Sequence, residues 1–233
     1  MTSCKVPGGI SVERERLSAY LHSQSTGQGE YLDKLRREAE AEKVPIIRIE
    51  MESFLAVLLE MKKPGKILEA GTAVGYSSMV MARATEKFRT RIDTIEKDEE
   101  RFAQAAGNIG ASEWKDRICQ MKGDVLEVFQ RLSAENRKYD LIFMDAAKGQ
   151  YIRYLPLALD LLETGGVLVS DNVLQDMTIL DSHFALERRE RTIHKRMRQY
   201  LYTLKHTEGL LTSIVPIGDG AAVTVKLKET KIQ

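Results

Sequence analysis

The chain is poor in cysteine, proline and aromatic residues, and it has no long apolar run. Its 233 residues include two cysteines, five prolines and 6% aromatic side chains. Cys4 and Cys119 are too few to build a disulfide framework, so we expect a reducing, cytoplasmic location. No apolar stretch approaches the roughly 20 residues of a membrane-spanning helix, and the start of the chain lacks a signal-peptide core. No membrane partner is expected.

An excess of charge of one sign is also lacking. Lys and Arg number 35, Asp and Glu 34, and the net charge is +1, so the molecule as a whole is not a polycation. The four histidines show no metal-ligand spacing. With 43% hydrophobic and 30% charged residues, the composition is that of a soluble globular protein. The length suffices for one large α/β domain with a substantial core.

The apolar pattern changes at Pro64. Before it, apolar residues recur at helical spacing; after it, short apolar runs alternate with helical segments, as in a parallel sheet covered on both faces. Near the end, only the turn 217–220 separates two apolar runs, and so short a link joins antiparallel strands. We predict a single domain, 1–233, with a helical N-terminal extension (1–63) and an α/β core (64–233) of the Rossmann-like type. The antiparallel closing strand is typical of methyltransferases rather than of dinucleotide-binding folds.

A glycine-containing loop follows the first predicted strand. Gly71 and Gly75 fall between a strand and a helix, where glycine lets the backbone turn tightly and approach a ligand closely. Glu69 stands at the start of this loop, and a carboxylate there would repel a pyrophosphate. A nucleotide with cationic groups is therefore favoured over NAD, and S-adenosylmethionine, with its sulfonium and ammonium groups, fits that requirement.

Three further polar residues are placed to bind such a cofactor. Glu96 ends the next predicted strand, where an acid hydrogen-bonds ribose hydroxyls. Asp124 ends the third strand, where an acid accepts a hydrogen bond from an adenine amino group. Ser77 begins the helix after the glycine loop, where hydroxyl and backbone N–H groups bind a carboxylate. Each residue alone is also compatible with an ordinary loop or helix-cap role.

Two polar stretches far apart in the chain each follow a short apolar run that is typical of a buried strand. The first begins with Asp145 and includes Lys148, and the second is Asp171 and Asn172. Because ligands bind at the carboxyl ends of parallel strands, we expect these side chains to converge. Two carboxylates and an amide oxygen suit a hard cation such as Mg²⁺. A lysine beside a cation loses its proton more easily, which favours Lys148 as a base.

Four segments resemble the cation-dependent O-methyltransferases, a family that includes the catechol and caffeoyl-CoA methyltransferases. They are Ile67–Ser77, Phe143–Tyr151, Ser170–Val173 and Val215–Gly220, and the likeness extends from about Leu17 to Lys228. The resemblance implies S-adenosylmethionine as the cofactor, a bound divalent cation and a homodimer. It implies that the metal ligands are Asp145, Asp171 and Asn172, and that the base is Lys148. It places at the cofactor Ile47, Ser77, Glu96, Asp124 and Asp145.

Within this family, the chain is similar to the bacterial enzymes that methylate 5-hydroxyuridine in the tRNA anticodon loop. The narrower likeness rests on Lys148–Tyr151, Val44–Ile47 and the basic segment around Arg188, Arg189 and Arg191. Those arginines are candidate phosphate contacts, although a basic helix face is often only solvated. The 4-carbonyl and 5-hydroxyl oxygens of this nucleoside are vicinal, like those of a catechol.

Three alternatives to a tRNA methyltransferase follow from the same residues. The first is a small-molecule methyltransferase of the catechol or caffeoyl-CoA type with an identical core. The second is a non-catalytic RNA-binding protein, which the intact set of two aspartates, an asparagine and a lysine disfavours. The third is a dehydrogenase, which Glu69 and the C-terminal hairpin disfavour. Many small-molecule members carry tryptophan or glycine shortly after the Asp-Asn pair, and segment 173–180 has neither.

Overall fold

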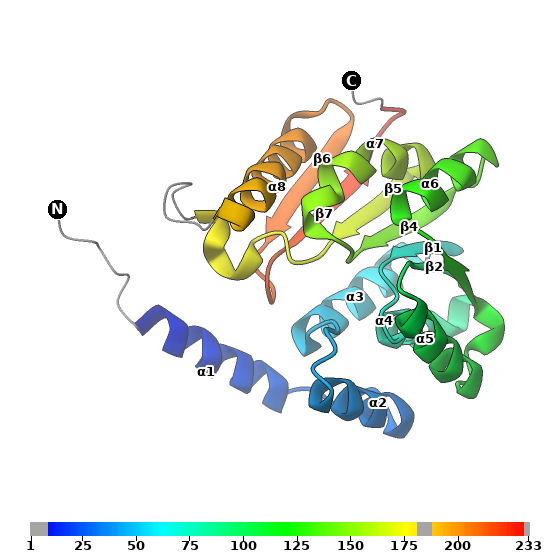
Figure 1. Ribbon diagram of the computed structural model, residues 1–233, viewed down its shortest axis with the longest axis vertical. Helices are drawn as coiled ribbons and strands as arrows, with labels where there is room; N and C mark the ends of the chain where they lie inside the picture. Colours follow the sequence, from blue (N-terminus) through cyan, green and yellow to red (C-terminus); the bar gives the residue numbers. More distant parts are fainter. Residues whose placement is uncertain (1–8, 181–187, 231–233) are drawn as a thin grey trace.

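The computed structural model describes residues 9–180 and 188–230, which form one seven-stranded sheet between two layers of helices (Figure 1). The strand order is β3-β2-β1-β4-β5-β7-β6. The strands are β1 (Lys66–Ala70), β2 (Arg91–Glu96), β3 (Ile118–Lys122), β4 (Tyr139–Met144), β5 (Leu162–Ser170), β6 (Leu210–Val215) and β7 (Ala221–Lys226). β7 pairs antiparallel with both β5 and β6, and the other pairings are parallel. The predicted mostly parallel sheet with an antiparallel C-terminal strand is confirmed.

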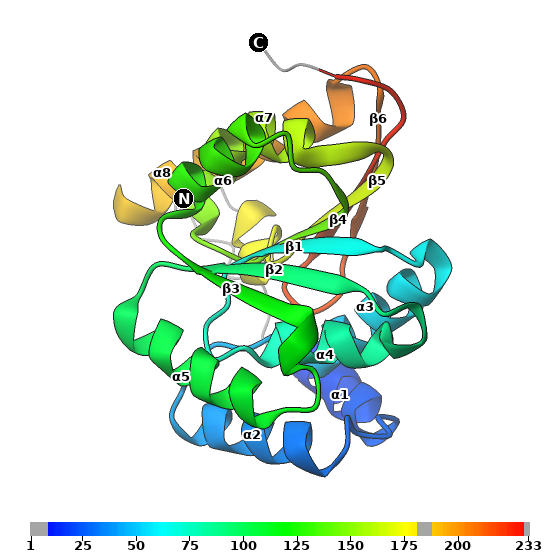
Figure 2. The ribbon, with the colours of Figure 1, turned by 90° about the vertical axis from the view of Figure 1, so that its right-hand side faces the viewer.

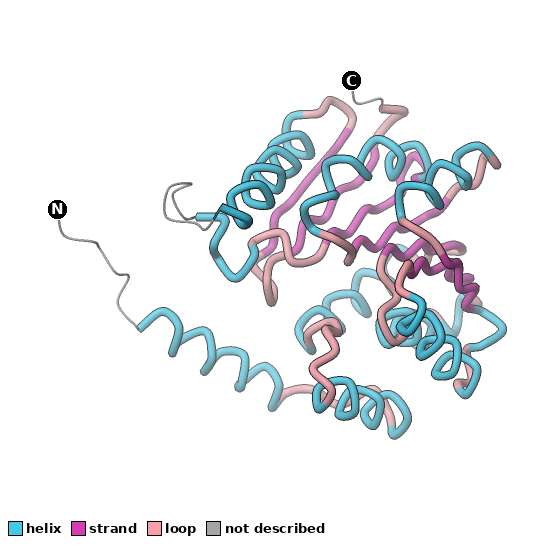
Figure 3. The backbone as a smooth tube through the Cα atoms, viewed as in Figure 1, coloured by secondary structure: helices cyan, strands magenta, loops and turns pink. Residues whose placement is uncertain are grey.

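The helices divide between the two faces of the sheet (Figures 2 and 3). One face carries α2 (Glu30–Ala41), α3 (Ile49–Lys62), α4 (Tyr76–Ala84) and α5 (Glu99–Ala111), and the other carries α6 (Val125–Ala134), α7 (Tyr151–Leu161) and α8 (Arg188–His206). α1 (Gly9–Ser23) projects from the body in Figure 1. Short 3₁₀ helices are η1 (Glu86–Phe88), η2 (Lys115–Arg117), η3 (Lys148–Gln150) and η4 (Gln175–Leu180). No described helix is long and apolar enough to cross a membrane.

Side chains of the central strands point alternately to the two faces of the sheet, and each face has its own hydrophobic core. On β4, Leu141 and Phe143 pack with the α2–α5 layer, whereas Ile142 and Met144 pack with the α6–α8 layer. All four are fully buried, which explains why this strand reads as a continuous apolar run. Within the N-terminal extension, Leu32 of α2 is fully buried in the same core as the α3 and α4 side chains. These helices therefore belong to the packed body of the protein.

The connections reverse direction between β1 and β4, which are the neighbouring central strands. From β1 the chain proceeds outward to β2 and β3, and it then returns to β4 and β5 on the other side. In open α/β sheets, ligands bind at the carboxyl ends of the strands beside such a reversal. The loops after Ala70 and Met144 meet there, and the backbone N–H of Asp145 donates to the Ala70 carbonyl at 2.9 Å.

Candidate active site

A cavity of about 580 Å³ lies at this edge of the sheet. Its lining includes nine of the ten residues predicted for the cofactor, the metal and the base: Ile47, Gly71, Ser77, Glu96, Asp124, Asp145, Lys148, Asp171 and Asn172. These nine residues are spread along the chain from position 47 to position 172, and the fold brings them to one cavity. The tenth residue, Glu69, is not part of the cavity wall.

Gly71 allows the β1 loop to lie directly against the β4 loop. Its φ is 105°, in the region that favours glycine, and a Cβ atom there would stand only 2.1 Å from the Asp145 carbonyl oxygen. The backbone N–H groups of Gly71 and Thr72 both donate to the Ile95 carbonyl at 3.1 Å. This turn therefore draws the ends of β1, β2 and β4 together around the cavity.

The Glu96 carboxylate is held in place by the backbone around it. One oxygen accepts from the Ala73 N–H at 2.9 Å, and the other accepts from the N–H groups of Lys97 and Asp98, each at 2.9 Å. The side chain thus links the glycine loop to the end of β2, while it also lines the cavity. A carboxylate fixed in this way is suited to accept further hydrogen bonds from a ligand diol.

We expect replacement of Glu96 by alanine to weaken S-adenosylmethionine binding by about tenfold or more. Charge-assisted hydrogen bonds to two ribose hydroxyls contribute roughly 1.5–3 kcal/mol each at best, and about 1.4 kcal/mol is one decade of affinity. Calorimetric titration measures the change. Asp98→Ala is the matched control, because Asp98 caps α5 through the Arg101 N–H in the same loop without lining the cavity. Equal affinity of wild type and Glu96→Ala would remove Glu96 from the cofactor site.

Asp124 and Ser77 each stand at the start of a helix. Asp124 is the N-cap of α6, and its carboxylate accepts from the Leu126 N–H at 2.9 Å while the residue also lines the cavity. Ser77 lies in the first turn of α4, which begins after Gly75 with a φ of 83°. Capping α6 is a structural role and does not by itself indicate ligand binding. Asp124 can contact a ligand because it also lines the cavity.

Glu69 lies in the core beneath the loop. It is fully buried, and it accepts hydrogen bonds from Ser78 and, at 2.6 Å, from Thr94. Among the described residues its second oxygen has no hydrogen-bond partner. Alternation along β1 explains this orientation, because Glu69 shares a face with Ile67, which packs against the α2–α5 layer. The carboxylate predicted to face the cofactor is turned toward α4 and β2 instead.

Burial raises the pKa of Glu69 to about 7 from an ordinary 4.5, and this predicts a pH-dependent stability. Between these two values the folded protein retains a proton that the unfolded chain has lost, so the free energy of unfolding falls as pH rises. Glu69→Gln removes this contribution. The free energy of unfolding of Glu69→Gln relative to wild type should therefore increase from pH 4.5 to 8 by an amount on the order of 3 kcal/mol. Urea unfolding at both pH values measures it; a constant difference would contradict it.

Asp145 and Asp171 stand at the adjacent ends of β4 and β5. The Asp171 N–H donates to the Met144 carbonyl at 3.0 Å, so the two residues follow paired strands. Burial raises the pKa of both carboxyls, and the charge of Asp145 raises the pKa of Asp171 further. The positive charge of Lys148 acts in the opposite direction on both carboxyls. The predicted convergence of these three side chains is thus present in the fold.

The donor set fits a hard divalent cation. Burial makes ionised Asp145 and Asp171 costly unless a positive charge accompanies them, and the Asn172 amide adds a neutral oxygen beside them. Asn172 has a φ of 56°, a conformation that asparagine tolerates better than most residues. Within the described residues, no group of three or more His, Cys, Asp and Glu side chains could hold a metal. The predicted set is of another kind, with two carboxylates and one amide.

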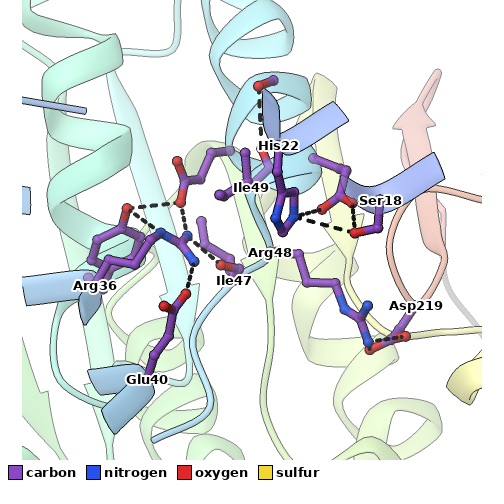
Figure 4. A network of polar contacts seen from close by, with 12 residues as sticks. Ser18, His22, Arg36, Glu40, Ile47, Arg48, Ile49 and Asp219 are labelled. Atoms are coloured by element: carbon purple, nitrogen blue, oxygen red, sulfur yellow. Dashed lines mark hydrogen bonds and ion pairs between the residues drawn. The ribbon is translucent and has the colours of Figure 1, made fainter. Parts of the chain in front are cut away.

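Asp219 and Arg48 also line the cavity, although the sequence assigned them no role. Asp219 lies in the turn between β6 and β7, and both its carboxylate oxygens accept from Arg48, at 2.8 and 2.9 Å (Figure 4). The Asn172 amide also lies 3.4 Å from Asp219. The Gly-Asp-Gly turn was a recognisable motif, but only the pairing of β7 with β5 brings it beside the predicted metal ligands.

A buried network ties the N-terminal helices to the cavity wall at Ile47 (Figure 4). Arg36 of α2 donates to the Ile47 carbonyl at 2.8 Å and to the Tyr76 hydroxyl at 3.2 Å, and it pairs with Glu52. The Tyr76 hydroxyl in turn donates to Glu52 at 2.8 Å. Tyr76 is the first residue of α4, so the network fixes the segment around Ile47 relative to the cofactor loop.

The basic segment is only partly described. Arg191 lies in α8 and is half-buried, whereas the side chains of Arg188 and Arg189 lie outside what the structure describes. α8 packs over the loop that follows Asp145, where Arg196 donates to the Gly149 carbonyl at 3.1 Å. A second cavity of about 690 Å³ lies between this helix and Lys148.

Residues 22–227 match the family model for O-methyltransferases. The chain belongs to that family. It is 35% identical over 131 residues to a catechol O-methyltransferase from Niastella koreensis, covering 56% of this chain and 59% of that relative. It is 25% identical over 175 residues to the caffeoyl-CoA O-methyltransferase of Stellaria longipes, covering 72% of each. The predicted family resemblance is confirmed, whereas the narrower likeness to tRNA-modifying members stays a prediction, as does the homodimer.

Solved structures agree with the fold. A Staphylococcus aureus protein provisionally named caffeoyl-CoA O-methyltransferase superposes with a TM-score of 0.82 and 30% identity, covering 90% of this chain and 98% of that one. The SAH-bound methyltransferase PaMTH1 of Podospora anserina superposes with a TM-score of 0.81 and 22% identity, covering 97% and 99%. The fold is the Rossmann-like fold of S-adenosylmethionine-dependent O-methyltransferases.

Proposed function

We propose that this O-methyltransferase moves the methyl group of S-adenosylmethionine to one hydroxyl of a small acceptor with two vicinal oxygens, of the catechol type. The observation that carries the proposal is the single cavity shared by the cofactor loop, Lys148 and the three metal-ligand candidates. The names of the relatives support the same acceptor class. This acceptor replaces tRNA as the first hypothesis, because the relatives support it better.

Glu96, Asp124 and Ser77 would bind the ribose, the adenine amino group and the carboxylate of the cofactor. All three line the cavity around the glycine loop. Gly71 lets the cofactor loop lie against the β4 loop, because a side chain there would collide with the Asp145 carbonyl oxygen. Glu69, behind the wall, would support α4 through Ser78 rather than contact the ligand.

Asp145, Asp171 and Asn172 would hold a divalent cation such as Mg²⁺. When bound, the cation would lower the pKa of the acceptor hydroxyl and fix its two oxygens beside the methyl donor. Lys148 begins η3 on the same side of the cavity and would take the proton from that hydroxyl. Asp145 lines the cavity between the cofactor loop and Lys148, so it would serve both the cation and the cofactor. Held in line with the sulfonium, the hydroxyl oxygen would bond to the methyl carbon as the carbon–sulfur bond breaks, and S-adenosylhomocysteine would leave. Positioning of the two reactants would supply much of the acceleration.

A tRNA acceptor is the second candidate, and the position of α8 favours it. This helix lies on the loop that carries Lys148, and Lys195 and Arg198 on it are exposed. Phosphates bound along α8 would therefore lie beside the mouth of the site. A 5-hydroxyuridine turned out of an anticodon loop presents the same vicinal oxygens as a catechol, and the same set of ligands would accept it.

The test offers both acceptors to the purified protein with labelled S-adenosylmethionine and Mg²⁺. We expect rapid methylation of catechol, no product with excess chelator, and little change in rate between low and high salt. tRNA from cells lacking this protein is the second acceptor, with nucleosides read by mass spectrometry. Faster conversion of 5-hydroxyuridine than of catechols, with activity falling steeply as salt rises, would reverse the order of the two candidates.

Variants in α8 separate the two acceptors further. Replacing Arg188, Arg189 and Arg191 with alanine should spare the reaction with catechol, because no described residue of α8 lines the cavity of the proposed active site. If tRNA is the acceptor, the same change should weaken tRNA binding and flatten its salt dependence. Unchanged tRNA methylation by the triple variant would show that this face of α8 is only solvated.

A further inference from the structure

Tyr151 joins the two strands that carry the predicted metal ligands. It is the first residue of α7 and is fully buried. Its hydroxyl lies 2.9 Å from the Met144 carbonyl oxygen and 3.2 Å from the Asp171 carbonyl oxygen. Met144 directly precedes Asp145, so one phenol contacts the backbone at both carboxylate positions.

The Tyr151 hydroxyl adds to a backbone hydrogen bond that already links the ends of β4 and β5. The Met144 carbonyl also accepts from the Asp171 N–H at 3.0 Å, which is the last parallel bond between β4 and β5. Beyond it the strands end, and the backbone of Asp171 turns into the Asp171-Asn172 loop. A single hydroxyl hydrogen shared by the two carbonyls holds them at a fixed separation where strand pairing stops.

The ring of Tyr151 is itself fixed. It packs edge-on against Tyr200 of α8, with centroids 5.5 Å apart and an interplanar angle of 70°. Tyr200 is also fully buried, and its hydroxyl bonds to the Ser170 side chain rather than to the backbone at either carboxylate. The two tyrosines are thus similar in burial and differ in what their hydroxyls contact.

We propose that Tyr151 is a positioning residue that sets the spacing between the Asp145 and Asp171 carboxylates for a divalent cation. This inference rests on the proposed metal site. A small cation such as Mg²⁺ requires ligand distances near 2.0–2.1 Å, so a shift of a few tenths of an ångström between the two strand ends costs affinity. Groups that orient metal ligands typically contribute about 10–100-fold to metal affinity.

The test uses Tyr151→Phe, which keeps ring, size and charge and removes only the hydroxyl. Tyr200→Phe is the matched control, because it removes an equally buried hydroxyl. We expect Mn²⁺, used as the probe cation and followed by the paramagnetic resonance of the free ion, to bind Tyr151→Phe about tenfold more weakly than wild type. Affinity for S-adenosylhomocysteine without metal should stay within about twofold, and Tyr200→Phe should bind Mn²⁺ like wild type.

Stability separates positioning from a purely structural role. Tyr151→Phe loses one hydroxyl hydrogen shared by two carbonyls and Tyr200→Phe loses one hydrogen bond to Ser170. Each loss is worth about 1 kcal/mol, so both variants should remain folded with similarly lowered Tm. Activity of Tyr151→Phe should recover as Mn²⁺ concentration is raised, which a general loss of structure would not allow. Equal Mn²⁺ affinity in wild type and Tyr151→Phe would overturn the positioning role alone. Absence of Mn²⁺ binding by the wild type would overturn it together with the proposed metal site.

Discussion

Replacing Asp171 with alanine should abolish methyl transfer while leaving the protein folded. The carboxylate is one of two charged ligands in the proposed metal set, and without it the cation would lose a principal ligand. kcat with a catechol acceptor at saturating Mg²⁺ should fall to the background rate. Cofactor affinity should change much less, because Asp171 is a proposed metal ligand and the predicted cofactor contacts come from other loops of the cavity wall.

Stability measurements give this expectation a second, independent readout. Burial raises the pKa of the Asp171 carboxyl, so at pH 8 without metal its charge opposes folding. Asp171→Ala should therefore have a Tm at least equal to that of wild type under those conditions, although it is inactive. Asp160→Ala, which removes an exposed carboxylate that accepts from Ser133, is the control for both measurements. Full activity of Asp171→Ala, or of wild type in excess chelator, would exclude the metal site.

Replacing Lys148 with methionine should lower the rate by about 10²–10⁴-fold, the usual contribution of a positioned general base. Methionine retains much of the length of the side chain and lacks the amine, so the loss should appear in kcat with little change in cofactor affinity. The pH dependence of kcat is the informative measurement, because the variant should lose the part of the profile that depends on deprotonating the enzyme base.

A second lysine serves as a control for whether the loss of one positive charge is enough to lower kcat. Lys87 is exposed and pairs with Glu60 on the surface, so Lys87→Met removes one positive charge without touching the site. It should leave kcat unchanged. If Lys148→Met kept wild-type turnover across the pH range, activation by the cation alone would suffice and Lys148 would not be the base.

The sequence was sufficient to predict that most of the candidate residues lie together, because strand ends are local features. Asp145 and Asp171 each follow a short apolar run, and such runs form the buried central strands β4 and β5. Parallel strands bring their carboxyl ends to one edge, so the convergence followed from pattern and topology together. Gly71 was identifiable for a similar reason, since close packing of two loops requires a residue without a side chain.

Side-chain direction was harder to predict than position. Glu69 stands at the end of β1, as expected, yet its carboxylate points into the core toward Ser78 and Thr94. Along a strand, successive side chains alternate between faces, so one residue decides whether a group faces a ligand or the interior. Composition and spacing do not decide which face of the sheet a side chain points to at a strand end. The pairing of β1 with β2 and β4 does decide it.

The sequence by itself determined the fold class and the positions of the candidate cofactor loop and of the proposed metal-and-base set, because each depends on short runs of residues. Only the tertiary structure decided that Asp219 and Arg48 meet beside Asn172 and that Tyr151 spans the ends of β4 and β5. These contacts join segments that are distant in the chain, and they depend on β7 entering the sheet antiparallel to β5 and on α7 packing against α8. Long-range pairing and packing, rather than local propensity, place such groups within hydrogen-bond distance.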